Sequence, residues 1–179
     1  MKYFFRIICG LFFCFFIASS AACSTLSYEE DVSFRCPFTE LNWESSLEDI
    51  ITIEGKDYST YDSVYGGLCY TFPKEYMDLN GTIKYMFDEN LNLVCVAWAY
   101  TSEDAQELYS LYDTINASVN QIFGESEYNP QNSTNYGNVW YREDGNIILS
   151  IMNADFNKAL QYAYLHPSVS SQKVEDKIS

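Results

Sequence analysis

TSEDAQELYSLYDTINASVNQIFG, residues 101–124, is the stretch that decides the fold. Its apolar residues recur at steps of three and four, which is typical of one apolar stripe along a helix. They are Ala105, Leu108, Leu111, Tyr112, Ile115, Val119, Ile122 and Phe123. Thr101 or Ser102 can cap the start, and Gly124 can end the helix in a left-handed conformation. About 22 residues at 1.5 Å each predict a helix of roughly 33 Å, which needs a partner layer to cover its apolar face.

The residues on either side of this helix predict that layer. Ser45 and Glu48 have the spacing of a capping box and predict a short helix that ends at Gly55. Residues 36–43 read as a first strand or an extended lead-in, and residues 125–138 as a surface loop. Alternating or continuous apolar runs predict strands at 65–72, 81–87, 91–100, 138–141, 146–152 and 159–165. Asp144-Gly145 is a hairpin signal between the two strands that flank it.

A helix followed by three strands thus occurs twice. This pattern predicts an α+β fold, an antiparallel sheet with helices on one face. The length allows a single domain, which we place at residues 36–166, followed by a polar tail at 167–179.

Composition excludes one class of partner. The formal net charge is −15, and removal of residues 1–22 takes away Lys2 and Arg6 and lowers it to −17. Such a surface repels phosphate backbones, so we expect no nucleic-acid binding.

The first 22 residues have the layout of an export signal. Lys2 and Arg6 precede an apolar run, and small residues lead up to Cys23. The run is too short to span a bilayer comfortably. Signal peptidase could cut after Ala22, or the Ser-Ala-Ala-Cys sequence could act as a bacterial lipobox, in which Cys23 is diacylated before cleavage. Ser20 stands where a lipobox usually has a large aliphatic residue.

The polar stretch that follows favours the lipoprotein. Residues 23–35 fit a tether between a lipid anchor and a folded domain. We therefore expect an exported protein that faces the exterior or the periplasm and touches the membrane only through its lipid.

The remaining cysteines leave two interpretations open. Cys69 and Cys95 lie in apolar, strand-like runs, so they can be buried small hydrophobes or form a cross-strand disulfide. A catalytic thiol ranks third. None of the cysteines has the C-x-x-C spacing of a zinc site, and the single histidine, His166, lies beside Pro167 near the end of the predicted domain.

Tyrosines are the compositional sign of a binding surface. The chain holds 16 of them, and tyrosine suits interfaces because it combines a large area with a polar tip. Several fall in or beside predicted loops and are candidates for gripping a protein or stacking on a glycan; the alternative is a half-exposed strand position. These candidates are Tyr58, Tyr61, Tyr65, Tyr128, Tyr136 and Tyr141.

The start of the short helix carries a resemblance. Residues 43–50, WESSLEDI, with Gly55 after them, resemble the W-G-x-S-x-E-E-V opening of small exported bacterial proteins, many of them lipoproteins. Glu44 stands where that motif has Gly. In outline, the layout of helices and antiparallel strands is similar to BamE-type outer-membrane lipoproteins and to β-lactamase inhibitor proteins. Both groups bind other proteins, so the resemblance implies an interaction module.

No catalytic motif competes with that interpretation. The sequence has no nucleophile elbow, P-loop, zinc-protease or dinucleotide signature, and we expect neither a cofactor nor a metal. We expect a non-catalytic binding or scaffolding module of a bacterial cell envelope, whose partner is a protein or glycan there. The alternatives are a secreted inhibitor or effector without a lipid anchor, and a small wall or carbohydrate hydrolase.

Overall fold

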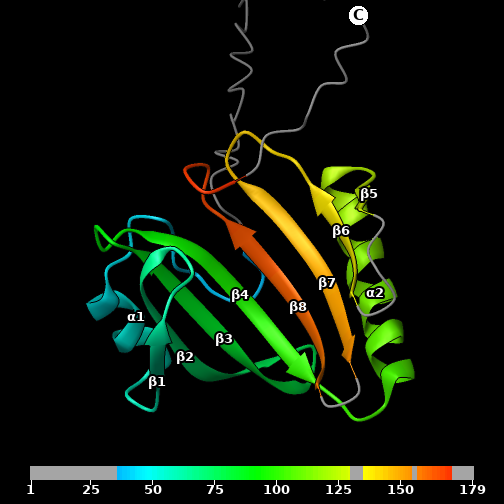
Figure 1. Cartoon of the computed structure of the whole chain (residues 1–179), viewed down its shortest axis with the longest axis horizontal. Coiled ribbons are helices and arrows are strands. Elements are labelled where there is room, and N and C mark those ends of the chain that lie inside the picture. Colours follow the sequence, from blue (N-terminus) through cyan, green and yellow to red (C-terminus); the bar gives the residue numbers. More distant parts are fainter. Residues whose placement is uncertain (1–35, 130–134, 155–156, 171–179) are drawn as a thin grey trace, which may run out of the picture. The chain divides into compact units, whose positions relative to one another are not determined.

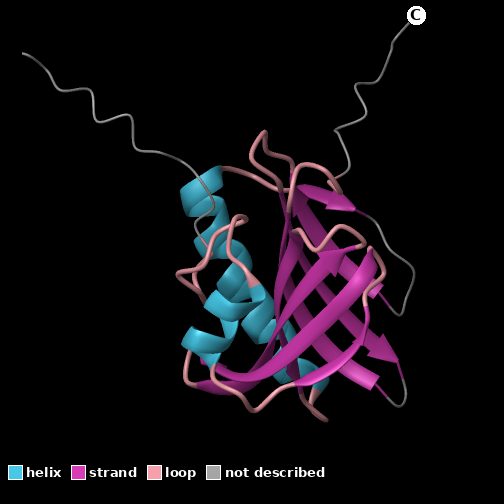
Figure 2. Ribbon diagram, turned by 90° about the vertical axis from the view of Figure 1, so that its left-hand side faces the viewer, coloured by secondary structure: helices cyan, strands magenta, loops and turns pink. Residues whose placement is uncertain are grey.

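A computed structural model describes residues 36–129, 135–154 and 157–170, which all belong to one compact unit. Two helices and eight strands form an α+β fold, and every pair of neighbouring strands is antiparallel. Figure 2 shows both helices on the same side of the sheet. The fold class predicted from the sequence is confirmed.

The strand order places the first strand of each half, β1 and β5, at the two edges of the sheet. The elements are α1 (Leu47–Glu54), β1 (Ser59–Asp62), β2 (Gly66–Tyr76), β3 (Leu79–Asp88), β4 (Leu93–Thr101), α2 (Ala105–Phe123), β5 (Glu127–Asn129), β6 (Asn135–Trp140), β7 (Asn146–Ala154) and β8 (Asn157–Leu165). The sheet runs β1-β2-β3-β4-β8-β7-β6-β5 (Figure 1). Each half of the molecule is therefore one helix followed by four strands, and β4 pairs with β8 at the centre.

The prediction of three strands per half was wrong, because it missed the two edge strands. β1 is STYD with all four residues exposed, and β5 is the three-residue segment EYN. Neither has an apolar alternation, since an edge strand this short contributes little to the core. β5 and the start of β6 also occupy much of the predicted loop at 125–138, so that prediction was wrong in part.

The ends of the two helices show that the two halves follow one plan. Each helix ends at a glycine with positive φ, Gly55 at 95° and Gly124 at 84°. A cation from another segment then meets the last residue of each helix, Lys74 from β2 and Arg142 from the turn between β6 and β7. Lys74 forms an ion pair with Glu54, and the Arg142 guanidinium lies 4.0 Å from the ring centroid of Phe123. A cation near a helix C-terminus opposes the negative end of the helix dipole, and neither last turn contains one of its own.

α2 has the predicted stripe and a different cap. Asp104 is the N-cap, and its side chain accepts from the Gln106 N–H, in place of Thr101 or Ser102. Ser102 instead accepts from the Asp104 N–H and donates to Glu107. The residues that α2 buries against the sheet are Leu108, Leu111, Tyr112, Ile115 and Val119.

α1 is also shifted by one residue from its predicted start. Ser46, not Ser45, is the N-cap, and the Asp49 side chain closes the capping box from the N3 position. Before it, residues 36–43 form turns and no strand. Phe38 is buried there, and its ring meets Tyr76, Tyr162 and Tyr164 edge-on at 5.5–6.0 Å. This segment covers the middle of the sheet, which the short α1 does not reach.

The core centres on Trp98 of β4. Its ring is fully buried, stacks on Tyr100 and donates from Nε1 to the Lys74 carbonyl at 3.1 Å. Gly81 of β3 leaves the room for this ring. A Cβ at Gly81 would lie 2.7 Å from the indole and 2.6 Å from the Ala99 carbonyl oxygen.

We expect Gly81→Ala to lower the free energy of unfolding by about 2 kcal/mol, since neither neighbour can retreat without repacking. Urea unfolding followed by tryptophan fluorescence measures the loss. The exposed neighbour Asn80→Ala serves as the control and should leave the midpoint nearly unchanged. Equal midpoints for the two variants would contradict this account of the Trp98 packing.

The C-terminal boundary extends past the predicted domain end. The Ser170 hydroxyl bonds the carbonyls of Leu165 and His166 and accepts from the Asn146 N–H. His166 packs edge-on against Trp43 with 5.3 Å between ring centroids, and its N–H donates to the Val94 carbonyl. Residues 167–170 are thus fastened to β7 and β8, whereas the prediction had the tail begin at residue 167.

Candidate functional site

The face of the sheet opposite the helices is the candidate binding surface. We call it the open face, and define it on the four central strands by the residues that share a face through the ladders. They are Thr82, Lys84 and Met86 of β3, Cys95, Ala97 and Ala99 of β4, Gln161, Ala163 and Leu165 of β8, and Ile148, Ser150 and Met152 of β7. Neither helix covers this face, as Figure 2 shows from the side.

The open face is nearly free of charge in a very acidic protein. Lys84 is the one charged residue among the positions just named, although the chain carries 25 acidic residues. The side chains are also small along its centre line, where Ala97 lies opposite Ala163 across β4 and β8. Cys95, Ala97 and Ala163 are themselves buried, and Tyr65, Met86 and Leu165 pack against them. The accessible part of the open face therefore lies around them, at side chains such as Gln161, Ser150 and Met152. The acidic residues of the sheet neighbourhood lie beyond it, as Glu75 does at the far end of β2.

Two of the predicted binding tyrosines lie beside the open face. Tyr65 packs against the cluster of Cys95, Ala97 and Ala163. Tyr61, on the edge strand β1, lies opposite Cys69 of β2 and is 47% exposed. Burial raises the pKa of each phenol to about 12, so both are neutral donors at physiological pH. The edge of the open face on the β1 side therefore carries two tyrosines, and the exposed Asp62 follows Tyr61 on β1.

The other four tyrosines do not join them. Tyr58 lies against Tyr70 and Phe72, on the helix side of the sheet, and Tyr141 is a partly exposed residue just after β6. Tyr128 lies on β5 and Tyr136 on β6, and their side chains fall outside the described part of the molecule. The structure thus brings two of the six candidate tyrosines to the open face, and their role in binding stays a prediction.

Of the two interpretations of Cys69 and Cys95, the buried small hydrophobe is confirmed and the cross-strand disulfide is wrong. Met86 of β3 stands between the two cysteines in the ladder, so they lie on strands two places apart. Strands are spaced about 4.8 Å apart, so the Cα atoms are farther apart than the roughly 7 Å that a disulfide spans. Cys36, Cys69 and Cys95 are free and buried in the described chain. Burial raises the pKa of the Cys95 thiol to about 12, which leaves it protonated and a poor nucleophile.

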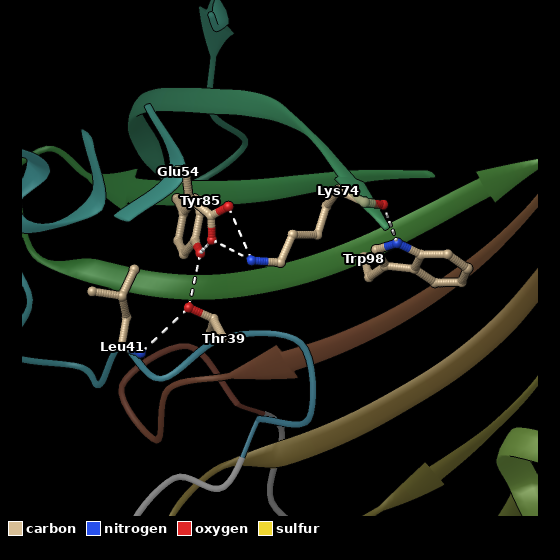
Figure 3. A network of polar contacts seen from close by, with 6 residues as sticks. All are labelled: Thr39, Leu41, Glu54, Lys74, Tyr85 and Trp98. Carbon is tan, nitrogen blue, oxygen red and sulfur yellow. Dashed lines mark hydrogen bonds and ion pairs between the residues drawn. The ribbon is translucent and has the colours of Figure 1, made fainter. Parts of the chain in front are cut away.

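A buried polar network lies on the helix side. Figure 3 shows Lys74 reaching Glu54 at the end of α1, with Nζ 2.9 Å from Oε1 and 3.0 Å from Oε2. The Tyr85 hydroxyl donates to Glu54 Oε1 at 2.7 Å and lies 3.0 Å from the Thr39 hydroxyl. The Glu54 side chain is only 4% exposed.

This network is better suited to holding α1 against its neighbours than to catalysis. Burial and the neighbouring Glu54 raise the pKa of Tyr85, so its proton stays in the bond to the carboxylate. Both oxygens of Glu54 are occupied by Lys74, and the group ties α1, the lead-in segment and β2 together. The open hollow beside it, about 520 Å³, is lined by Lys74 and by the exposed acids Glu40 and Glu75.

The described residues contain neither a metal-binding cluster nor a helix that could cross a membrane. Among them, no cluster of three or more His, Cys, Asp or Glu is arranged to hold a metal ion. Neither α1 nor α2, the helices in that part of the chain, has the length and apolar character needed to cross a bilayer. The predicted signal, residues 1–22, and the candidate lipidation site Cys23 lie outside the described residues.

Sequence reasoning missed the open face, although a signal for it exists. β4 was read as apolar on both faces, but its residues alternate in size: Val96, Trp98 and Tyr100 face the helices, and Cys95, Ala97 and Ala99 face away. β8 repeats this alternation, with Tyr162 and Tyr164 on the helix side and Ala163 between them. Alternation of large and small apolar residues on central strands thus indicates one face that packs on the helices and one face of small side chains, and residues 93–98 of β4 are buried on both.

Comparison with known proteins gives no further assignment. A scan against protein-family models, a search of curated proteins and a search of solved structures each found no match.

Proposed function

We propose that this protein is an exported, non-catalytic binding module of a bacterial cell envelope, anchored by lipid on Cys23, and that its open face binds a partner protein. The observation that carries the proposal is the near absence of charge on the open face of a chain with a net charge of −15. The centres of protein interfaces are depleted of charged residues and enriched in aromatic ones.

The remaining surface supports the same function. Acidic side chains around a nearly uncharged face attract a partner with a basic rim and repel anionic headgroups and nucleic acids. A protein partner fits this face better than a glycan, because a glycan stacks on exposed rings and only one of the two tyrosines beside the face, Tyr61, is exposed, whereas Tyr65 is half-buried.

The proposal that the open face binds a partner protein is tested by site-specific photo-crosslinking in cells that express the protein. A benzophenone amino acid at Gln161, on the open face, should give a discrete protein adduct, and the same group at Asp113, exposed on α2, should not. Ala99→Arg should remove the Gln161 adduct by placing a charge on the open face. Ala117→Arg, on the exposed side of α2, should retain it. An adduct from Asp113 alone would contradict the proposal.

The anchor is tested by mass spectrometry of the mature N-terminus. We expect a diacylated Cys23 as the first residue and a Cys23→Ser variant that is released into the soluble fraction. A wild-type protein that begins at an unmodified Cys23 and is soluble after export would overturn the lipid anchor. That result would favour the secreted form without a lipid anchor, and it would leave the argument for the open face unchanged.

A further inference from the structure

A second site lies on the helix side, in a hollow of about 550 Å³. Three separate segments line it: the lead-in at Cys36 and Pro37, the β2–β3 hairpin at Tyr76 and Met77, and one flank of α2. Its floor is made by β8 through Tyr162 and Tyr164. A volume of 300–1,000 Å³ is usual for small-molecule sites.

The hollow arises from an asymmetry between the two halves. α1 has 8 residues and α2 has 19, so α1 cannot cover the middle of the sheet as α2 does. Phe38 fills part of the gap by packing on Tyr76, Tyr162 and Tyr164. The space that remains lies between Phe38's segment and α2.

None of the described residues that line the hollow carries a charge. Ile115 and Val119 form its apolar side, and Thr114 and Ser118 of α2 supply hydroxyl groups. The Thr114 hydroxyl donates to the Ser110 carbonyl, so toward the hollow it can act as an acceptor. Burial raises the pKa of the Cys36 thiol well above its usual range, so this group is neutral as well. On the floor the hydroxyls of Tyr162 and Tyr164 are hydrogen-bonded at 2.8 Å, and burial keeps both protonated by raising their pKa.

The mouth of the hollow exposes apolar side chains to solvent. Ile122 of α2 is 67% exposed and Met77 is 42% exposed, and both line the hollow. Met77 has φ 55°, a left-handed conformation that is unusual for a bulky residue. Apolar residues that converge on a concavity are typical of ligand sites, whereas single exposed ones are ordinary.

We propose that this hollow binds an uncharged aliphatic amphiphile, with its chain along Ile115 and Val119 and a hydroxyl-type head bonded to the tyrosine and α2 hydroxyls. The chemistry of the walls selects the class of ligand. An anionic head would meet no cation among the lining residues and a repulsive net charge of −15. Arg142, which stacks on Phe123 at the hollow, is already paired with Asp144. A cationic head would find no carboxylate among the lining residues. This inference does not depend on the open face or on the lipid anchor.

The test uses three probes with one chain length: 1-decanol, decanoate and decylammonium. In methyl NMR titrations of the protein at pH 7, we expect 1-decanol to shift Met77, Ile115, Val119 and Ile122 saturably. Ile148 and Met152 of the open face should not move. Decanoate and decylammonium should bind at least tenfold more weakly than 1-decanol.

Two variants on α2 decide where the probe binds. Ser118→Phe projects a ring into the hollow and should weaken 1-decanol binding at least tenfold, while Ala117→Phe on the neighbouring exposed position should not. Both are surface positions of a helix, so both variants should fold. The proposal is overturned if 1-decanol gives no saturable shifts, if the charged probes bind equally well, or if Ser118→Phe leaves binding unchanged.

Discussion

The protein is expected to unfold in alkali over a narrow range near pH 11. Five buried acidic groups are held in their neutral form by burial: the thiols of Cys36 and Cys95 and the phenols of Tyr85, Tyr162 and Tyr164. Burial raises the pKa of Cys95 from 9.0 to about 12 and raises the pKa of the other four as well. In the unfolded chain these groups ionise at their usual pKa values.

The sign follows from the raised pKa values. The folded state retains protons that the unfolded state releases, so the stability from these groups is complete below pH 9 and is lost as the pH rises. Each group removes about 1.4 kcal/mol per pH unit once its unfolded form is ionised, first the thiols above pH 9 and then the phenols above pH 10. For Cys95 alone the total is about 4 kcal/mol. Together they exhaust a typical stability of about 5–15 kcal/mol near pH 11.

Urea unfolding at pH 7, 9, 10 and 11 measures the effect. We expect nearly equal free energies of unfolding at pH 7 and 9, a loss of about 3 kcal/mol at pH 10 and a collapse by pH 11. Cys95→Ala is the control, because it removes one thiol and should flatten the slope between pH 9 and 10. A free energy of unfolding that stays constant to pH 11 would show that these groups are not buried in neutral form.

The second large effect is expected from Lys74→Met, which should cost about 3 kcal/mol. The substitution removes the cation from Glu54, whose side chain is 4% exposed, and leaves a carboxylate that neither water nor a lysine compensates. The Tyr85 hydroxyl still donates to Glu54, so the loss stops short of unfolding the protein.

The cause is isolated by a second change and a control lysine. Adding Glu54→Gln to Lys74→Met should restore about half of the loss, because the neutral amide can still accept from Tyr85 and needs no cation. Lys56→Met, at an exposed position just after α1, should change the free energy of unfolding by less than about 0.5 kcal/mol. If Lys74→Met costs no more than Lys56→Met, the ion pair does not fasten α1.

The sequence predicts those parts of the fold that have a strong period or a turn signal. The α2 stripe, both terminal glycines and the Asp144-Gly145 turn lie where their patterns put them. The sequence does not predict β1 and β5, because an exposed edge strand needs no apolar alternation. The caps shift by one to three residues because several Ser, Thr and Asp residues compete at each helix start, and only the packed stripe selects Ser46 and Asp104.

The candidate sites are harder to predict because they depend on contacts between distant segments. Tyrosine content indicates a binding surface, but only the ladder register brings Tyr61 and Tyr65 to the open face and sends Tyr58 to the other side. The Lys74–Glu54 pair joins residues 20 positions apart on a strand and a helix, and no local pattern predicts it. The hollow beside α2 depends on the unequal helix lengths, which the sequence predicts, and on the position of Phe38, which it does not.

The pairing of β4 with β8 joins two halves of similar layout edge to edge within one chain. Ala97 lies opposite Ala163 at this junction, and Gly81 and Gly145 approach the carbonyls of Ala99 and Leu165 on either side. A half cut off after β4 would present that strand as an unprotected sheet edge. Two copies of such a fragment could close the gap through one another, as two protomers, in the way β8 closes it now.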